Sequence, residues 1–200
     1  MIIDETVATV DGRTQRRRRN IDAVVDSVIE LARAGNLDPT SEEIAALAGI
    51  SHRSIYRYYD TRAELLDAAV VRAFDAVSAE VFHDDVRNGS FDERVEWFVA
   101  ARMEMYRRLR SVVRMEVAHA AVDSSGTPGV DRARAALRTR LVDVFIAEFD
   151  RYEPEERRLV AAVVDAAFQF EALEYLDANA GLDDDQVQRA LALNLRRHLA

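Results

Sequence analysis

Arginines are concentrated at two places in the first third of the chain. Arg16, Arg17, Arg18 and Arg19 are consecutive, and residues 51–62 contain three arginines but a single acidic residue. Guanidinium groups bind phosphate oxygens and guanine edges through paired hydrogen bonds. These two places predict contact with nucleic acid. Because the formal net charge of the chain is −9, any DNA-binding surface must be local.

The residues around the second group predict two short helices joined by a tight turn. Thr40 followed by Glu43 is a capping-box pattern, which begins a helix over about residues 41–48. Gly49 then suits the turn because it has no Cβ atom, and a second short helix is expected over about residues 52–58. This arrangement is typical of a helix-turn-helix.

The second short helix presents polar side chains on its outer face. Ser51 is expected to cap it, so that its first turn points away from the protein. Three side chains of that turn have groups that hydrogen-bond base edges: His52, Arg53 and Ser54. Three later side chains suit contacts to phosphate: Tyr56, Arg57 and Tyr58. Double-stranded DNA is therefore the predicted partner.

The composition indicates an all-α protein. Gly and Pro number only 7 and 3, the hydrophobic fraction is 49%, and alternating Val, Ile and Thr runs are missing. After a loose arm over residues 1–15, about nine helices are expected, with a polar break at 83–89. Their approximate ranges are 17–34, 41–48, 52–58, 62–82, 90–108, 109–122, 131–151, 154–179 and 184–199.

Several function classes find no support in the sequence. The chain has no cysteine, which excludes disulfides and thiolate chemistry. It has no signal-peptide pattern and no apolar run of about 20 residues, so a cytoplasmic protein that does not enter a membrane is expected. Glu116, His119 and Asp123 share a helix face, but they fit intrahelical pairs better than a metal site. We expect no metal, no cofactor and no enzyme activity.

The helix-turn-helix residues resemble those of one family, the TetR-family transcriptional regulators. The matching positions are Ile44-Ala45, Ala48-Gly49-Ile50-Ser51, Ile55-Tyr56, Tyr59, Arg62 and Leu65-Leu66. The resemblance covers about residues 17–70. Two places depart from the family pattern, since Leu31-Ala32 replaces the usual Leu-Phe pair and Arg62 replaces the usual lysine.

The resemblance implies a role for each part of the chain. It implies a DNA-binding domain over residues 1–66, with its helix-turn-helix at about 41–59, and a ligand-binding and dimerisation domain over 67–200. Phosphate contacts are implied for Thr40, Tyr56, Tyr58 and Arg62. Base contacts are implied for His52, Arg53 and Ser54, and a groove or backbone contact for the run of four arginines.

The resemblance further implies an effector pocket between the later helices and a dimer built from the last two. Candidates for the pocket are Trp97, Met103, Tyr106, Met115, His119, Phe145, Phe149 and Phe168. The last two predicted helices also carry more apolar residues than solvent-facing helices need. Candidates for the dimer interface are Val160, Val163, Val164, Ala167, Phe170, Leu191 and Leu195.

The resulting hypothesis is a homodimeric repressor that binds a palindromic operator and is released by a small, partly apolar effector. An alternative keeps the DNA-binding head but makes the C-terminal region a docking module for a protein partner. A helical enzyme is a remote third possibility, because it would need a buried polar cluster that the sequence hardly offers.

Overall fold

The structure, a computed structural model, describes residues 12–82 and 88–200 and is all-helical over these ranges, which confirms the predicted class. Its helices are α1 (Gly12–Arg33), α2 (Ser41–Ala48), α3 (His52–Ile55), α4 (Arg62–Val81), α5 (Phe91–Asp123), α6 (Pro128–Val144), α7 (Ile146–Phe149), α8 (Pro154–Ala166), α9 (Phe170–Ala178) and α10 (Asp184–Leu199). Within the described ranges, no helix has the length and apolar character that crossing a membrane requires.

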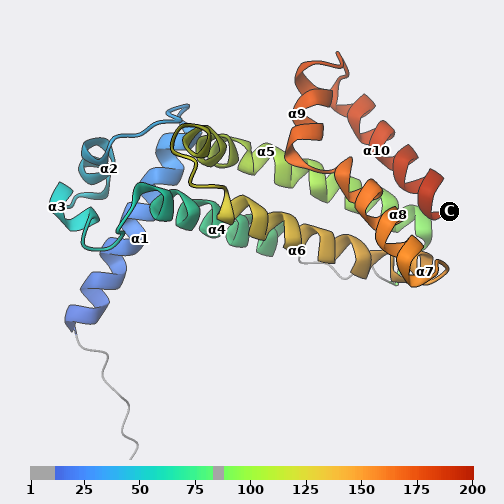
Figure 1. Cartoon of the computed structure of the whole chain (residues 1–200), viewed down its shortest axis with the longest axis horizontal. Helices are drawn as coiled ribbons and strands as arrows, with labels where there is room; N and C mark the ends of the chain where they lie inside the picture. The colour runs from blue at the N-terminus through green and yellow to red at the C-terminus, as the bar shows by residue number, and fades with distance from the viewer. Residues whose placement is uncertain (1–11, 83–87) are drawn as a thin grey trace, which may run out of the picture.

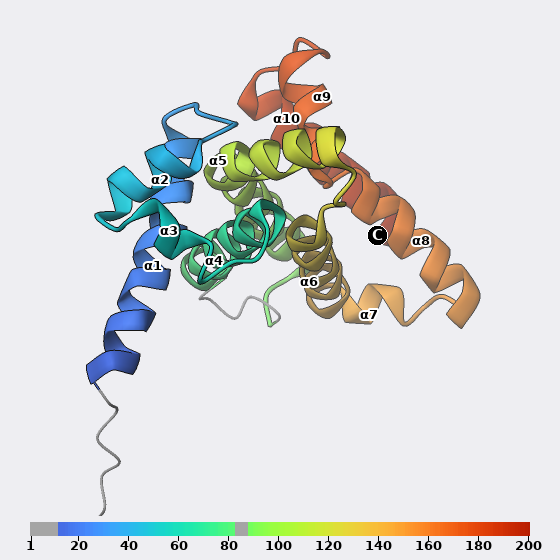
Figure 2. The ribbon, with the colours of Figure 1, turned by 60° about the vertical axis from the view of Figure 1, so that its left-hand side comes forward.

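The helices form an elongated molecule whose two ends are formed by different helices. Figure 1 shows α1, α2 and α3 at one end, the C-terminus at the other, and α4, α5 and α6 running between them. Figure 2, turned by 60°, shows the first turns of α1 projecting beyond the neighbouring helices. The DNA-binding residues predicted from the sequence therefore gather at one end.

The first helix begins earlier than predicted. Because α1 starts at Gly12, residues 12–15 are helical and do not belong to a loose arm, which corrects that prediction, and the run of four arginines lies wholly within the helix. Arginine and glutamine have high helix propensity, and no proline interrupts the segment. Residues 1–11 of the predicted arm, and 83–87 of the predicted polar break, lie outside the described residues.

The caps around the tight turn agree with the sequence in part. Thr40 and Glu43 form the predicted capping box, and Gly49 ends α2 in the left-handed conformation, with φ of 65°. Ser51 makes no side-chain cap; its Oγ lies 2.8 Å from the Oγ of Ser54 instead. The helix α3 is also shorter than predicted, since residues 56–58 continue it only as turns.

Three further predictions of helix ends were wrong. The segments 90–108 and 109–122 form one helix, α5, because nothing at their junction breaks it and Leu109 packs into the core there. The predicted helix 131–151 divides at Phe145 into α6 and α7. The predicted helix 154–179 divides at Phe168, whose side chain is buried and whose carbonyl oxygen accepts a hydrogen bond from Arg102.

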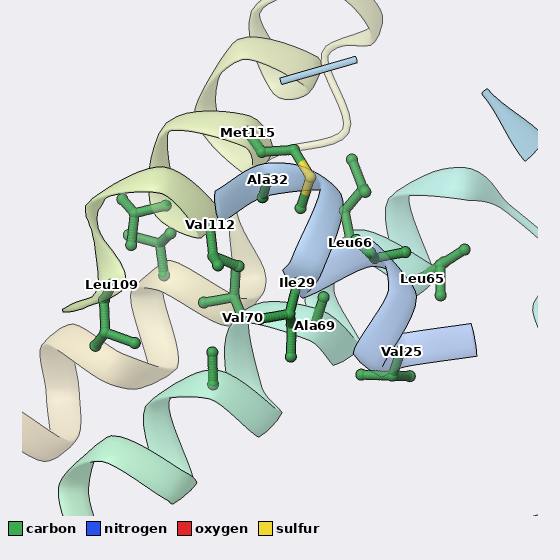
Figure 3. Packing of buried hydrophobic residues seen from close by; sticks show 14 of the residues in the cluster. Val25, Ile29, Ala32, Leu65, Leu66, Ala69, Val70, Leu109, Val112 and Met115 are labelled. Carbon is green, nitrogen blue, oxygen red and sulfur yellow. The ribbon is translucent and has the colours of Figure 1, made fainter. Parts of the chain in front are cut away.

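Two clusters of buried side chains hold the helices together. The first joins the DNA-binding end to the middle of the molecule, and Figure 3 shows part of it: Val25, Ile29 and Ala32 of α1, Leu65, Leu66, Ala69 and Val70 of α4, and Leu109, Val112 and Met115 of α5. The second joins α5 to the helices from α6 onward. Since the first cluster extends across residue 66, α4 packs in the same cluster as the helix-turn-helix.

A buried ion pair fastens α5 to α7. The guanidinium of Arg94 binds the carboxylate of Glu148 through two hydrogen bonds of 2.6 and 2.8 Å, and both side chains are largely buried. The hydrogen bonds from Arg94 lower the pKa of Glu148. Ionised Glu148 is therefore the form that stabilises the fold.

We expect Glu148→Gln to lower the free energy of unfolding by about 2–4 kcal/mol at neutral pH, because it leaves a buried guanidinium without its counter-charge. The contribution of ionised Glu148 is complete above the pKa of an unfolded glutamate, about 4.3, and is lost as the pH falls through the lower folded pKa. Denaturant titrations across this range should show the difference from the wild type shrinking in acid. Glu96→Gln, which breaks an exposed pair with Arg196, should cost less than about 1 kcal/mol.

Candidate functional site

The outer face of α3 is exposed as the sequence predicted. His52 and Arg53 are exposed, while Ile55 is 3% exposed and anchors the helix in the first core. Among the described residues, Arg53 has no ion-pair or hydrogen-bond partner. Its guanidinium is therefore available to a ligand outside the chain.

A hollow of about 670 Å³ separates the N-terminal half of α1 from α3 and the turn before it. Its walls combine guanidinium groups with small polar side chains from two segments far apart in sequence. They are Arg13, Thr14, Arg16, Arg17, Asn20, Gly49, Ile50, Ser51, Ser54, Arg57 and Tyr58. Four arginines around one hollow make a positively charged surface in a chain that is acidic overall.

Tyr58 is fixed at the wall of this hollow. Asn20 Nδ2 and Arg57 Nη2 donate hydrogen bonds to its hydroxyl oxygen at 3.1 and 3.0 Å. The guanidinium groups of Arg57 and Arg17 lie 5.1 and 5.6 Å from its ring centroid. These contacts, that of Asn20 foremost, lower the pKa of Tyr58. Because its oxygen accepts both bonds, its own hydroxyl hydrogen remains free to be donated to a phosphate.

Tyr56 and His52 are held by residues of α2. The Tyr56 side chain is 56% exposed, and its hydroxyl lies 3.1 Å from Ser41 Oγ. The His52 ring packs edge-on against Tyr56 at 5.0 Å, and its Nε2 lies 3.3 Å from Glu42 Oε1. Both side chains reach the surface with fixed orientations, although Glu42 occupies one nitrogen of His52.

Two of the predicted phosphate contacts have partners inside the chain. The hydroxyl of Thr40 belongs to the capping box with Glu43, and the guanidinium of Arg62 pairs with Asp38. A phosphate bound at Thr40 would share its hydroxyl with Glu43, and a phosphate bound at Arg62 would share its guanidinium with Asp38. Arg18 and Arg19 are exposed but do not line the hollow.

The predicted DNA-binding residues did not include Gly49 and Ile50 of the turn, nor three residues of α1 that line the hollow: Arg13, Thr14 and Asn20. The signal was present in the spacing. Arg13, Arg16, Arg17 and Asn20 recur at intervals of three and four, which places them on one face of a helix. This face was not recognised because the first helix was predicted to start only at about residue 17, after Arg13 and Arg16.

The structure places the predicted pocket residues in several different environments. A small cavity lies between α4, α5, α6 and the α8–α9 junction, and of the candidates only Tyr106 and Phe168 line it. Met115 is buried in the first core, and Met103, Phe145 and Phe149 in the second. Trp97 packs against both cores, and His119 pairs with Asp123 at 2.8 Å. These six residues do not line this cavity, and helical periodicity in the sequence does not separate a cavity wall from a filled core.

The residues predicted for the dimer interface differ in their exposure. Val164, Leu191 and Leu195 are at most 2% exposed and pack within the chain, so they are not available to a partner. Val160, Ala167 and Phe170 are partly buried against the cores. Val163 is 57% exposed, and two apolar residues missed by the sequence, Leu159 and Leu193, are 53% and 52% exposed. These three lie on the outer faces of α8 and α10.

Comparisons with known proteins found a family model and several solved structures similar to this chain. Residues 27–69 match the family model of bacterial regulatory proteins of the tetR family. A TetR-family transcriptional regulator from Streptomyces coelicolor is 21% identical, covers 92% of this chain and 78% of its own, and superposes with a TM-score of 0.64. A transcriptional regulator from Rhodococcus sp. Rha1 is 21% identical, with coverages of 92% and 95% and a TM-score of 0.61. A search of curated proteins gave no match.

Proposed function

We propose that this chain, a TetR-family transcriptional regulator by its N-terminal segment and its fold, is a ligand-responsive repressor that binds a palindromic operator as a homodimer. The observation that carries the proposal is the positively charged hollow between α1 and α3, beside the exposed guanidinium of Arg53. Enzyme activity is not proposed, because members of this family are transcriptional regulators.

The two kinds of side chain at this surface suit two tasks. Arg53, with His52 and Ser54 beside it, is proposed to contact base edges in the major groove and so to select the sequence. Tyr58, Arg57 and the arginines of α1 are proposed to bind phosphates on both sides of that groove, which positions the head without selecting sequence. The hydroxyl hydrogen left free on Tyr58 supports the phosphate role.

Replacing Arg16 and Arg17 together by alanine tests the role of the hollow. Each phosphate contact that is lost should flatten the dependence of log K on log salt by about 0.9, so the loss of two contacts in each subunit of the dimer should reduce the slope by about 3.6. Arg18→Ala/Arg19→Ala is the matched control, with the same charge change on the same helix but outside the hollow. Equal loss of slope in the two variants would mean that the arginine run acts as a diffuse charge and not through the hollow.

Dimerisation is proposed through the outer faces of α8 and α10. Leu159, Val163 and Leu193 expose apolar surface there, and small side chains such as Ala162 and Ala166 permit close approach of a second copy. A two-fold axis would make an Ω-shaped dimer and place the heads over half-sites about 34 Å, or a multiple of this, apart. A palindromic operator follows from that symmetry.

Release of DNA is proposed to begin at the cavity. Phe74 of α4 lines it, and α4 also packs in the core that holds the helix-turn-helix. The close approach of α6 to α4 at Gly129, where an added Cβ would lie 2.9 Å from Asp67 Oδ1, leaves little room for independent movement. A coupling of about 1–3 kcal/mol would weaken DNA binding by about 5- to 150-fold. The cavity favours a small effector over the docking of a protein partner.

The division into a DNA-binding domain over 1–66 and a ligand-binding and dimerisation domain over 67–200 is kept as a proposal about function. The first core crosses this boundary, which supports coupling between the two parts and argues against their independent movement.

A further inference from the structure

The cavity between α4, α5, α6 and the α8–α9 junction is small and almost wholly apolar, with a volume of about 60 Å³. Its apolar wall is formed mainly by Phe74, Met105, Leu109, Val113, Leu137 and Phe170. The polar side chains that line it are Arg102, Tyr106, Arg134 and Gln169. An apolar cavity with a few polar groups at one side is the usual form of a small-molecule site.

Arg102 is the unusual member of this wall. It is 3% exposed, and its Nη2 donates a hydrogen bond to the carbonyl oxygen of Phe168. Its Nη1 is buried and has no hydrogen-bond partner among the described residues. Burial lowers the pKa of Arg102 to about 10, so the guanidinium is still charged at neutral pH. A buried charged donor without an acceptor is costly unless a ligand supplies the acceptor.

The acidic residue beside Arg102, Asp165, does not accept a hydrogen bond from the Nη1 of Arg102. Asp165 is 1% exposed, and its Oδ2 accepts hydrogen bonds from Arg138 Nε at 2.9 Å and Gln169 Nε2 at 2.8 Å. Its Oδ1, like the Nη1 of Arg102, has no partner among the described residues. Arg138 already binds this carboxylate, and Nη1 of Arg102 is left without an acceptor.

The other charged and polar groups at the cavity are already engaged. The Tyr106 hydroxyl donates to Glu174 at 2.5 Å, and Arg134 pairs with Asp131 and Glu171. Among the lining residues that the structure describes, Nη1 of Arg102 is thus the buried donor that lacks an acceptor.

We infer that the cavity binds a small apolar carboxylic acid in its ionised form, with the carboxylate accepting a hydrogen bond from Nη1 of Arg102 and the hydrocarbon part lying against Met105 and Leu109. This inference names the chemical class of the effector, so its regulatory role rests on the proposed function. The binding itself is independent of DNA.

The volume of the cavity links binding to movement. A cavity of about 150 Å³ is known to hold benzene, so 60 Å³ accommodates only a small acid without displacement of the walls. A larger acid must push the walls apart, and Phe74 carries that displacement to α4. Longer acids should therefore weaken DNA binding more than acetate does.

The test is calorimetric titration of the full chain with acetate, butanoate, hexanoate and benzoate, each compared with its neutral amide. We expect at least one carboxylate to bind about 10- to 100-fold more tightly than its amide, because a hydrogen bond to a charged group contributes more than one to a neutral group. Arg102→Met should remove this preference. Arg134→Met, at the same cavity but with its arginine already paired, should retain it.

Folding of the variants is checked by thermal unfolding without ligand, and Arg102→Lys, which retains a positive charge, should keep part of the preference if Arg102→Met does not fold. Amides that bind as tightly as the acids, Arg102→Met that retains the preference, or no carboxylate binding to the wild type would each overturn the inference. Wild-type protein that binds DNA but no carboxylate would reject the inference and leave the proposed function standing. Protein that binds a carboxylate but no DNA would reject the proposed function and leave the inference about the cavity standing.

Discussion

Arg53→Ala is expected to weaken binding to the specific operator by about 5- to 150-fold for each half-site while leaving binding to unrelated duplex nearly unchanged. The reason is that Arg53 stands on the exposed first turn of α3 without a partner in the described chain, so its full hydrogen-bonding capacity is available to a base. A bidentate contact to guanine is the strongest that a single side chain makes in the major groove. Fluorescence anisotropy with operator, single-base variants and scrambled duplex measures the effect.

Arg57→Ala is the matched comparison, because it removes the same residue type four positions later, in the turns that follow α3. Arg57 lies against the ring of Tyr58 and lines the hollow, which suits a phosphate contact. Its loss should weaken operator and scrambled duplex alike and flatten the salt dependence. If both variants lose base discrimination equally, the division between base and phosphate contacts is incorrect.

Val163→Asp is expected to convert the dimer to a monomer and to reduce operator affinity by at least about 100-fold. Val163 is 57% exposed on α8, and two-fold symmetry would bring two new carboxylates into the same apolar interface. A monomer engages one half-site only and loses the advantage of linking two contacts, which is worth about 100- to 10,000-fold. Sedimentation should report 22.6 kDa for the variant and twice that mass for the wild type.

Val122→Asp controls for a new charge at an exposed valine. Val122 is 87% exposed near the end of α5, away from the proposed interface, so this change should leave mass and affinity unaltered. A wild type that sediments as a monomer, or a Val163→Asp protein that remains dimeric, would contradict the interface proposed on α8 and α10.

Local sequence signals predicted local structure well. The capping box at Thr40 and Glu43 and the left-handed Gly49 give the bounds of α2, and Pro154 and the acidic start at Asp184 give the first residues of α8 and α10. Each of these signals acts within about one helical turn, so neighbouring residues suffice to read it. The helix-turn-helix is recognisable for the same reason.

Features that depend on distant partners were not predictable. At the break between α8 and α9, the carbonyl oxygen of Phe168 accepts a hydrogen bond from Arg102, which lies 66 residues earlier in the chain. Nothing in the spacing of α5 marks Arg102 as buried, since an arginine in a helix is usually read as surface. The hollow likewise joins α1 to a turn about thirty residues later, and only the tertiary fold brings their arginines together.

The central claim is that a charged surface built from α1 and α3, presented twice by a dimer, recognises a symmetric DNA sequence. Sequencing the genomic fragments that the purified protein retains at moderate salt tests this claim most directly. The account predicts that few fragments are retained, that they share an inverted repeat, and that Arg53→Ala protein no longer enriches that repeat. Retention of no fragment even at low salt, or of fragments without a shared symmetric sequence, would contradict it.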